Sequence, residues 1–234
     1  DLAWSSALKR HVAFVEQDDL VFEGLTVRET LAFSARLRLP AASLKEKLER
    51  VDETLKLLRL ESCAETPVGG VGGKTISGGE RKRLMVGQEM LTRPRLLCCD
   101  EPTSGLDSAT ACVVVEALRD LARERRVAVV ASIHQPSSRL FLLFDELLLL
   151  RKGGLTYRGS TADAGDAFAG APFHLPCPAA YSAPDWLMEI VVENKVDSDD
   201  EKKRVLDERY GPSTLPPRTE PLRSLRAQKR RQRY

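Results

Sequence analysis

The sequence predicts an α/β fold in which helices flank a mostly parallel sheet. Short apolar runs end abruptly at polar residues, and amphipathic segments of helical length separate them. Such runs are typical of buried parallel strands, and their alternation with helices is typical of α/β proteins. The 234 residues are 42% hydrophobic and 30% charged, which suits one α/β domain with some excess chain. The expected strands are His11–Val15, Leu96–Cys99, Val127–Ala131 and Leu147–Leu150.

The composition argues against several classes of function. The formal net charge is only +2, so no global field favours a polyanion, and we expect no nucleic acid partner. The five cysteines include Cys98 and Cys99 inside an expected strand, which indicates buried thiols in a reducing compartment rather than a metal site. The longest apolar tract, Leu140–Leu150, contains two acidic residues and is too short to cross a bilayer.

Capping signals place the helices. Thr26–Glu29 forms a capping box that opens a helix, and Pro40 stops that helix. Ser43–Glu46 forms a second box, which opens an amphipathic helix. A further helix is expected over residues 108–126, and a hairpin turn is expected at 152–154. The apolar stripe expected on the second helix comprises Leu44, Leu48, Val51, Leu55 and Leu58.

The most informative stretch begins with Ser77-Gly78-Gly79-Glu80. A hydroxyl and two residues without side chains precede a helix, so backbone N–H groups can approach an anion and the helix dipole favours its charge. A plain capping box between Ser77 and Glu80 also satisfies the spacing. Capping alone does not require two glycines in the first turn, where each costs about 1 kcal/mol relative to alanine. Both readings stay open at this point.

A pair of carboxylates follows the strand Leu96–Cys99. Ligands of parallel sheets gather at the carboxyl ends of the strands, which is where Asp100 and Glu101 stand. These two can divide the work, with Asp100 holding Mg²⁺ and Glu101 polarising the attacking water. A solvated acidic turn is the alternative. The segment Ser104–Asp107 then leads into the next helix as an ordinary turn would.

In this order and spacing the three features resemble the ABC-type ATPases. Ser77–Glu80 resembles the family signature, with Glu in place of the usual Gln, Leu96–Glu101 resembles the Walker B strand, and Ser104–Asp107 resembles the D-loop. The resemblance implies ATP and Mg²⁺ as ligands, contacted by the signature and by Asp107. It also implies that Gln17, after the first strand, contacts Mg²⁺ or the attacking water. His134 resembles the H-loop residue that contacts the γ-phosphate.

Three phrases resemble the G subfamily, the white/brown-type half-transporters. They are residues 25–35, 133–138 and 182–190, the last with Ser-Ala-Pro-Asp where the subfamily has Asn-Pro-Ala-Asp. The resemblance implies a nucleotide-binding domain over residues 1–192, with a helical subdomain at about 25–95. Residues 193–234 are charged and are expected to form a flexible linker towards a transmembrane domain.

The glycine-rich stretch Val68–Thr75 ends in Gly-Lys-Thr but is not expected to hold phosphate. A P-loop requires Gly where Val68 stands and a buried strand before it. The expectation is therefore a fragment lacking the Walker A region and the membrane spans, with its N-terminal strands missing and little ATPase activity of its own. The alternative is a natural protein that has lost half of its nucleotide site.

The family mechanism is ATP hydrolysis between two nucleotide-binding domains arranged head to tail, with the signature of one serving the ATP of the other. The implied function is export of lipid, sterol, pigment or xenobiotic-type substrates, from the cytoplasmic face of a membrane. The alternatives are a soluble ABC ATPase of translation or DNA repair, and a partner domain that donates only its signature. We expect Gly79→Asp to block the shared site and leave the fold intact, since a first-turn Asp suits the helix dipole.

Overall fold

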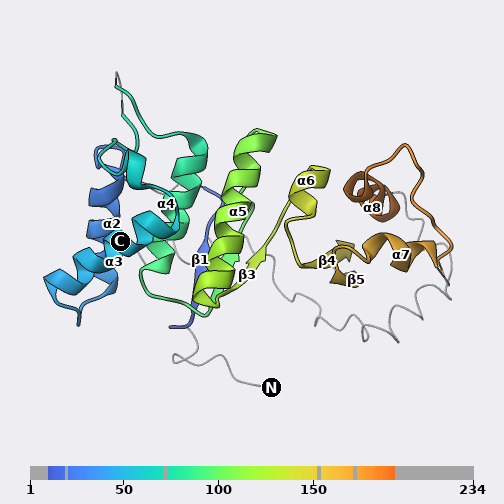
Figure 1. The fold of residues 1–234 in the computed structure, drawn as a ribbon, viewed down its shortest axis with the longest axis horizontal. Helices are drawn as coiled ribbons and strands as arrows, with labels where there is room; N and C mark the ends of the chain where they lie inside the picture. The colour runs from blue at the N-terminus through green and yellow to red at the C-terminus, as the bar shows by residue number, and fades with distance from the viewer. Residues whose placement is uncertain (1–9, 19–20, 71–72, 152–153, 171–172, 193–234) are drawn as a thin grey trace, which may run out of the picture. The chain divides into compact units, whose positions relative to one another are not determined.

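The computed structural model describes residues 10–18, 21–70, 73–151, 154–170 and 173–192. The chain divides into two compact units, residues 1–143 and 144–234, which are described separately here. Figure 1 shows the order of the helices and strands along the chain. The first unit contains every residue that the sequence singles out for nucleotide chemistry.

A three-stranded parallel sheet forms the centre of the first unit. Its strands are β1 (Val12–Val15), β2 (Leu96–Cys99) and β3 (Ala128–Ala131), with β2 in the middle. Val12 pairs with Leu96, which pairs with Ala128, so all three strands end at the same edge. This confirms the predicted parallel arrangement. The helices of the unit are α2 (Val27–Arg38), α3 (Leu44–Leu57), the 3-10 helix η1 (Glu61–Cys63), α4 (Gly78–Met90), α5 (Ser108–Arg125) and α6 (Ser138–Phe141).

The helices begin where the sequence predicts them. The side chains of Thr26, Ser43 and Ser77 each accept a hydrogen bond from the backbone N–H three residues later, and a glutamate at that position bonds back to the cap. Each box satisfies N–H groups that a helix cannot pair internally. α5 ends at Arg126, whose φ of 53° is left-handed, the usual way for a helix to end.

Helices α4 and α5 pack on one face of the sheet. Ala13, Val15, Leu97 and Cys99 point into this core and are almost fully buried. The opposite face is largely exposed, and Val130 retains 50% of its accessible surface. The expectation of a fully buried third strand is therefore wrong, because β3 lies at the edge and the described helices cover one face only.

The apolar stripe of α3 is only partly buried. Val51, Leu55 and Leu58 belong to the core, whereas Leu44 and Leu48 are exposed. The prediction of a buried stripe is wrong for these two residues, because the first turns of α3 lie outside the core. The helix still packs along α2 through its later turns.

The glycine-rich stretch before the signature is turn and loop in its described part, as predicted. Val68 donates its N–H to Leu25 O at 2.8 Å, and Gly69 donates to Glu23 O at 3.1 Å. Gly70 has a φ of +130°, which only glycine adopts without strain. No strand precedes this stretch among the residues described between η1 and α4. The remaining residues of the stretch, 71–72, lie outside the described part.

The second unit pairs a hairpin with two helices. β4 (Glu146–Arg151) and β5 (Gly154–Ser160) are antiparallel, and α7 (Ala164–Ala169) and α8 (Ala183–Val192) follow. Most of the predicted hairpin turn lies outside the described residues. The core is aromatic: Phe168 contacts Tyr157, Phe173 and Trp186. None of the helices within the described ranges is long and apolar enough to cross a bilayer.

The predicted linker, residues 193–234, lies outside the described residues. The predicted domain boundary at residue 192 and the helical subdomain at about 25–95 stay predictions. Helices α2, α3 and α4 fall within that subdomain's expected range.

Candidate functional site

Two carboxylates stand directly after the central strand of the sheet. The N–H of Asp100 donates to Val15 O at 2.9 Å, which extends the pairing of β1 and β2 by one residue. Glu101 has a φ of 44°, a left-handed conformation that is uncommon for a residue other than glycine. The chain therefore bends sharply between the two side chains, and the surrounding contacts hold that strained backbone in place.

Gln17 and Glu101 meet at the carboxyl ends of the strands. Gln17 follows the end of β1, and its Nε2 donates to Glu101 Oε2 at 2.7 Å. The two residues are 84 positions apart, and parallel pairing of β1 with β2 brings them to the same edge. A carboxylate held by an amide in this way has a defined orientation and keeps lone pairs for another donor.

Ser132 contacts the carboxylate of Asp100 and the backbone of Glu101, although no feature of the sequence singled it out. Its hydroxyl donates to Asp100 Oδ1 at 2.7 Å and accepts the N–H of Glu101 at 2.8 Å. It is the first residue after β3, and its N–H donates to Cys99 O. Its position at the end of a parallel strand was the available signal, since the same reasoning selects Asp100.

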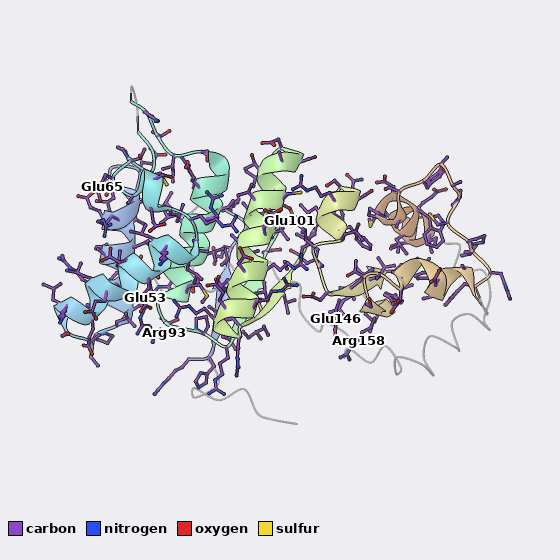
Figure 2. All side chains as sticks on the ribbon, in the orientation of Figure 1. Glu53, Glu65, Arg93, Glu101, Glu146 and Arg158 are labelled. Atoms are coloured by element: carbon purple, nitrogen blue, oxygen red, sulfur yellow. The ribbon has the colours of Figure 1, made fainter. Side chains whose placement is uncertain are left out.

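His134 and Glu101 line one cavity of about 230 Å³. The other walls come from Thr103, Ser104 and Gly105, part of the segment that resembles the D-loop. The structure thus brings the predicted histidine to the predicted general base, around a space with polar walls. Figure 2 labels Glu101 at this end of the first unit.

The start of α4 combines a cap with free amides. Ser77 donates its N–H and its hydroxyl to Glu80 Oε2 at 2.7 and 2.9 Å, and its Oγ accepts the N–H of Glu80. Partial burial acts to raise the pKa of Glu80, but hydrogen bonds from Ser77 and from Cys63 outweigh it and hold this pKa below its usual value. Among the described groups, the first-turn amides of Gly78 and Gly79 are left for an anion.

Packing requires glycine at residue 79 and leaves little room at residue 78. A Cβ at Gly79 would overlap Cγ2 of Thr110 on α5, and one at Gly78 would lie 3.0 Å from Leu106 Cδ2. The expectation that Gly79→Asp leaves the fold intact is therefore wrong, because α4 and α5 approach too closely for any side chain there. The signature and the residues that precede α5 form one closely packed unit.

Asp107 acts as the N-cap of α5. Its Oδ1 accepts the N–H groups of Ala109 and Thr110, both at 3.0 Å, and its Oδ2 accepts the Thr110 hydroxyl at 2.6 Å. These bonds, first of all that from the Thr110 hydroxyl, hold the pKa of Asp107 below its usual value. The capping role is a direct observation, whereas contact with a nucleotide stays a prediction.

Lys82 links the signature helix to the Gln17 loop. Its side chain is buried, and Nζ donates to the backbone oxygen of Gln17 at 2.8 Å. Sequence reasoning missed this residue, because a lysine within a basic run on an amphipathic helix normally faces solvent. The site is therefore built from four segments: the end of β1, the end of β2, the end of β3 and the first turns of α4.

The donor atoms suit Mg²⁺ bound together with phosphate. Within the described ranges no group of three or more His, Cys, Asp or Glu side chains could hold a metal ion alone. Mg²⁺ usually takes one or two carboxylates and completes its shell with substrate phosphates and water. Asp100 and Gln17 supply oxygen donors of this kind at the same edge of the sheet.

Comparisons with known proteins agree with this geometry. A family model described as "ABC transporter" matches residues 2–104, and one described as "ABC-2 type transporter" matches residues 134–208. ABC transporter G family member 22 of Arabidopsis thaliana is 48% identical over 170 residues, 72% of this chain. The chain belongs to the G subfamily of ABC transporters. Protein white of Drosophila melanogaster, another relative of this ABC chain, is 41% identical over 207 residues, 86% of the chain.

The fold has a solved counterpart in cbiO1 from Clostridium perfringens, described as part of the ABC transporter complex cbiONQ. The TM-score is 0.59 over 72% of this ABC chain and 63% of that chain, at 22% sequence identity. At this identity the likeness establishes the fold. The chain spans between a fifth and a third of the length of its curated relatives, 22% for the first relative above and 29% for protein white.

Proposed function

We propose that this chain binds and hydrolyses ATP as part of a G-subfamily exporter. The observation that carries the proposal is the arrangement at the carboxyl ends of the parallel strands. Gln17 holds Glu101, Ser132 holds Asp100, and His134 shares a cavity with Glu101. The identity to G family members over most of the chain supports the same function.

Each residue has a distinct role in this proposal. Glu101 accepts a proton from the attacking water as general base, and the amide of Gln17 orients its carboxylate. His134 donates a hydrogen bond to the γ-phosphate across the cavity that it shares with Glu101. Asp100 and Gln17 would hold Mg²⁺. When bound, that ion neutralises charge on the phosphate oxygens.

The signature serves the ATP of a second nucleotide-binding domain. The amides of Gly78 and Gly79 belong to the first turn of a 13-residue helix, whose dipole adds positive potential; Ser77 and Gly78 are exposed, and Gly79 is buried against α5. The Ser77 hydroxyl, now bonded to Glu80, can turn towards a phosphate oxygen when one arrives. The partners in this proposal are a second such domain and the transmembrane domain of the same transporter.

The proposed setting is the cytoplasmic face of a membrane, with export of a lipid, sterol, pigment or xenobiotic-type substrate. The names of the relatives support transport rather than work on nucleic acid. We also propose that the chain alone hydrolyses ATP slowly. The Lys74 segment follows a turn and not a strand in the described residues, so it makes a poor phosphate cradle.

The test of hydrolysis is Glu101→Gln in the full-length protein. The amide keeps the shape of the side chain but cannot accept a proton, so turnover should fall by about 10²–10⁴-fold. ATP binding should persist, as measured by equilibrium binding of labelled ATP. Glu49→Gln, which replaces an exposed glutamate on α3, is the matched control and should keep its activity. Turnover of Glu101→Gln within threefold of the parent protein would contradict the assignment.

The test of the shared site is Gly78→Asp in the Glu101→Gln protein. Slow hydrolysis should trap an ATP-bound dimer of the nucleotide-binding domains, and a carboxylate at residue 78 should prevent it by repelling the partner's phosphate. Gly73→Asp is the control for added charge, because a Cβ there meets no atom within 4 Å. Gly78→Asn is the control for packing, because it meets Leu106 Cδ2 as the Asp does and lacks the charge. Cross-linking between domains with and without ATP measures the dimer. An undiminished ATP-dependent dimer in Gly78→Asp would show that the start of α4 is only a helix cap.

A further inference from the structure

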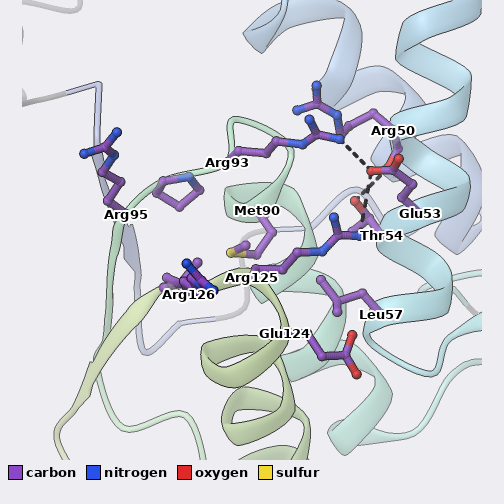
Figure 3. A pocket seen from close by; sticks show the side chains of 12 residues that line it. Arg50, Glu53, Thr54, Leu57, Met90, Arg93, Arg95, Glu124, Arg125 and Arg126 are labelled. Atoms are coloured by element: carbon purple, nitrogen blue, oxygen red, sulfur yellow. Dashed lines mark hydrogen bonds and ion pairs between the residues drawn. The ribbon is translucent and has the colours of Figure 1, made fainter.

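A second and larger cavity lies at the amino ends of the parallel strands. Its volume is about 590 Å³, within the range of small-molecule sites. Arg95 and Val127 line it, and each stands one residue before a strand, β2 and β3 respectively. Helix α3 and the ends of α4 and α5 complete the walls (Figure 3). The cavity and the carboxylate cluster therefore belong to opposite ends of the same strands.

Positive charge dominates the lining of this cavity. Its carboxylates are Glu53 and Glu124, whereas five of its residues are arginines, so the cationic groups outnumber the anionic ones by three. The arginines come from three segments of the chain and are Arg50, Arg93, Arg95, Arg125 and Arg126. We call this site the arginine pocket.

Internal contacts neutralise only part of this charge. Glu53 Oε2 accepts from Arg93 at 2.8 Å and lies 3.8 Å from Arg125, so one carboxylate serves two guanidinium groups. Arg50 donates to Leu91 O at 2.8 Å. Partial burial, followed by the nearby charges of Arg93 and Arg125, lowers the pKa of Arg50. The pocket thus holds more positive charge than its own acidic residues balance.

Two of the guanidinium groups have no partner in the described part of the chain. Arg95 and Arg126 are exposed, and neither side chain makes a hydrogen bond or ion pair with another described residue. Arginines near the C-termini of helices commonly complement the helix dipole, which accounts for Arg125 and Arg126 at the end of α5. It also accounts for Arg50, through its bond to Leu91 O at the end of α4. That explanation does not extend to Arg95, which precedes a strand and pairs its backbone N–H with His11 O.

We propose that the arginine pocket binds phosphate groups, carried by a small phosphorylated solute or by a lipid headgroup. A guanidinium group presents a planar fork of N–H donors that matches two phosphate oxygens at once. Arg95 and Arg126 supply such forks from neighbouring strand starts, and Arg50 on α3 and Arg93 in the segment before β2 add charge. A bound phosphate supplies the negative charge that Glu53 and Glu124 together cannot.

This binding is separate from the proposed nucleotide site. Asp100 and Ser132 follow β2 and β3, whereas Arg95 and Val127 precede the same two strands. A phosphate in the arginine pocket therefore contacts none of the residues assigned to ATP hydrolysis. Its failure to bind would leave the hydrolysis proposal standing, and loss of hydrolysis would leave the pocket intact.

The probe for the test is inorganic pyrophosphate, titrated into the full chain in a calorimeter at fixed ionic strength. We expect saturable binding that weakens at least tenfold in Arg95→Gln/Arg126→Gln. The matched control is Arg36→Gln/Arg123→Gln, which removes the same charge from exposed positions outside the pocket and should stay within twofold. Circular dichroism of each variant establishes that all are folded.

A second measurement separates the two sources of phosphate. Vesicles of phosphatidylcholine, with and without a tenth of phosphatidylinositol 4-phosphate, are sedimented with the full chain and with both double variants. Pocket-dependent binding to the phosphorylated vesicles identifies a lipid headgroup, and pocket-dependent binding of pyrophosphate alone identifies a solute. The proposal is overturned if pyrophosphate does not bind saturably, if Arg95→Gln/Arg126→Gln binds as well as the control, or if Glu101→Gln abolishes binding instead.

Discussion

The two ends of the parallel sheet carry opposite chemistry. At the carboxyl ends of the strands, Gln17 donates to the side chain of Glu101, and the Ser132 hydroxyl bonds the side chain of Asp100 and the backbone N–H of Glu101. At the amino ends, Arg95 and its neighbours surround a cavity rich in guanidinium groups. Figure 2 labels Glu101 at one end of this unit and Arg93 with Glu53 at the other.

The contrast shows how differently a polypeptide can assemble two sites. The carboxyl-end site uses residues that directly follow strands, so the pairing register of the sheet aligns them. The amino-end pocket takes residues from α3, from the ends of α4 and α5, and from the segments before β2 and β3. The first has its groups tied to one another by hydrogen bonds, whereas the second keeps Arg95 and Arg126 without partners in the described chain.

The first prediction tests the metal role at the carboxyl end. Asp100→Asn in the full-length protein should lower turnover about a hundredfold or more, because the charged oxygen that stabilises Mg²⁺ is lost. Asp52→Asn, at an exposed ion pair on α3, should stay within twofold. Steady-state ATP hydrolysis over a range of Mg²⁺ concentrations is the measurement. An equal loss of turnover in both variants would contradict a specific role of Asp100 in holding Mg²⁺.

The second prediction concerns the packing next to that site. Gly79→Ala should lower the free energy of unfolding by about 1–3 kcal/mol, because the new methyl overlaps Thr110 Cγ2. Thr110→Ser removes that methyl and keeps the hydroxyl bonded to Asp107, so the double variant should recover most of the loss. Gly165→Ala, which meets no neighbour, should be neutral or slightly stabilising. Urea unfolding of the full chain gives all four values.

The third prediction tests whether Ser132 positions the carboxylates. Ser132→Ala should lower turnover about tenfold and raise the Mg²⁺ concentration needed for half-maximal activity, as is common when a partner of a metal ligand is removed. The KM for ATP should change little, and Ser132→Thr should restore activity because it keeps the hydroxyl. A parent-like Mg²⁺ dependence in Ser132→Ala would show that the contacts of this hydroxyl to Asp100 and Glu101 are incidental.

The smallest effect is expected at the amino end. The hydrogen bond from Arg93 is the main cause that holds the pKa of Glu53 below its usual value. The stabilisation is therefore present above the unfolded-state pKa of Glu53 and is lost as the pH falls through its lower folded-state value. Because Glu53 is 45% exposed, solvent screening limits the contribution to about 0.2–1 kcal/mol. Arg93→Gln should lower the free energy of unfolding by that amount at pH 7 and not at all at pH 2, as measured by urea unfolding. A larger loss at pH 2 than at pH 7 would contradict the direction of the pKa shift.

Much of the first unit could be predicted, because its signals are local in the sequence. The capping boxes at Thr26, Ser43 and Ser77 occur where hydroxyl and glutamate stand three residues apart. The strands Val12–Val15 and Leu96–Cys99 occur where short apolar runs end at polar residues. In each case one physical rule, applied to adjacent residues, was sufficient.

The features that could not be predicted depend on distances between elements that are remote in the sequence. The requirement for glycine at residue 79 comes from Thr110, which belongs to another helix. The arginine pocket requires residue 50 to approach residue 126, and no periodicity in the chain reports that distance. The exposure of Val130 depends on which helices cover the sheet. The composition of the strand does not indicate this coverage.

Gln17 divides its two tasks between different atoms. Its side-chain amide holds Glu101, while its backbone oxygen accepts the buried ammonium group of Lys82. The backbone oxygen is present whatever amino acid is encoded at this position, so a missense change there removes the reactive contact and keeps the anchor. A substitution at Gln17 therefore changes the contact to Glu101 and leaves the loop in place. A substitution at Lys82 removes the anchor of the loop and leaves the Gln17 side chain unchanged.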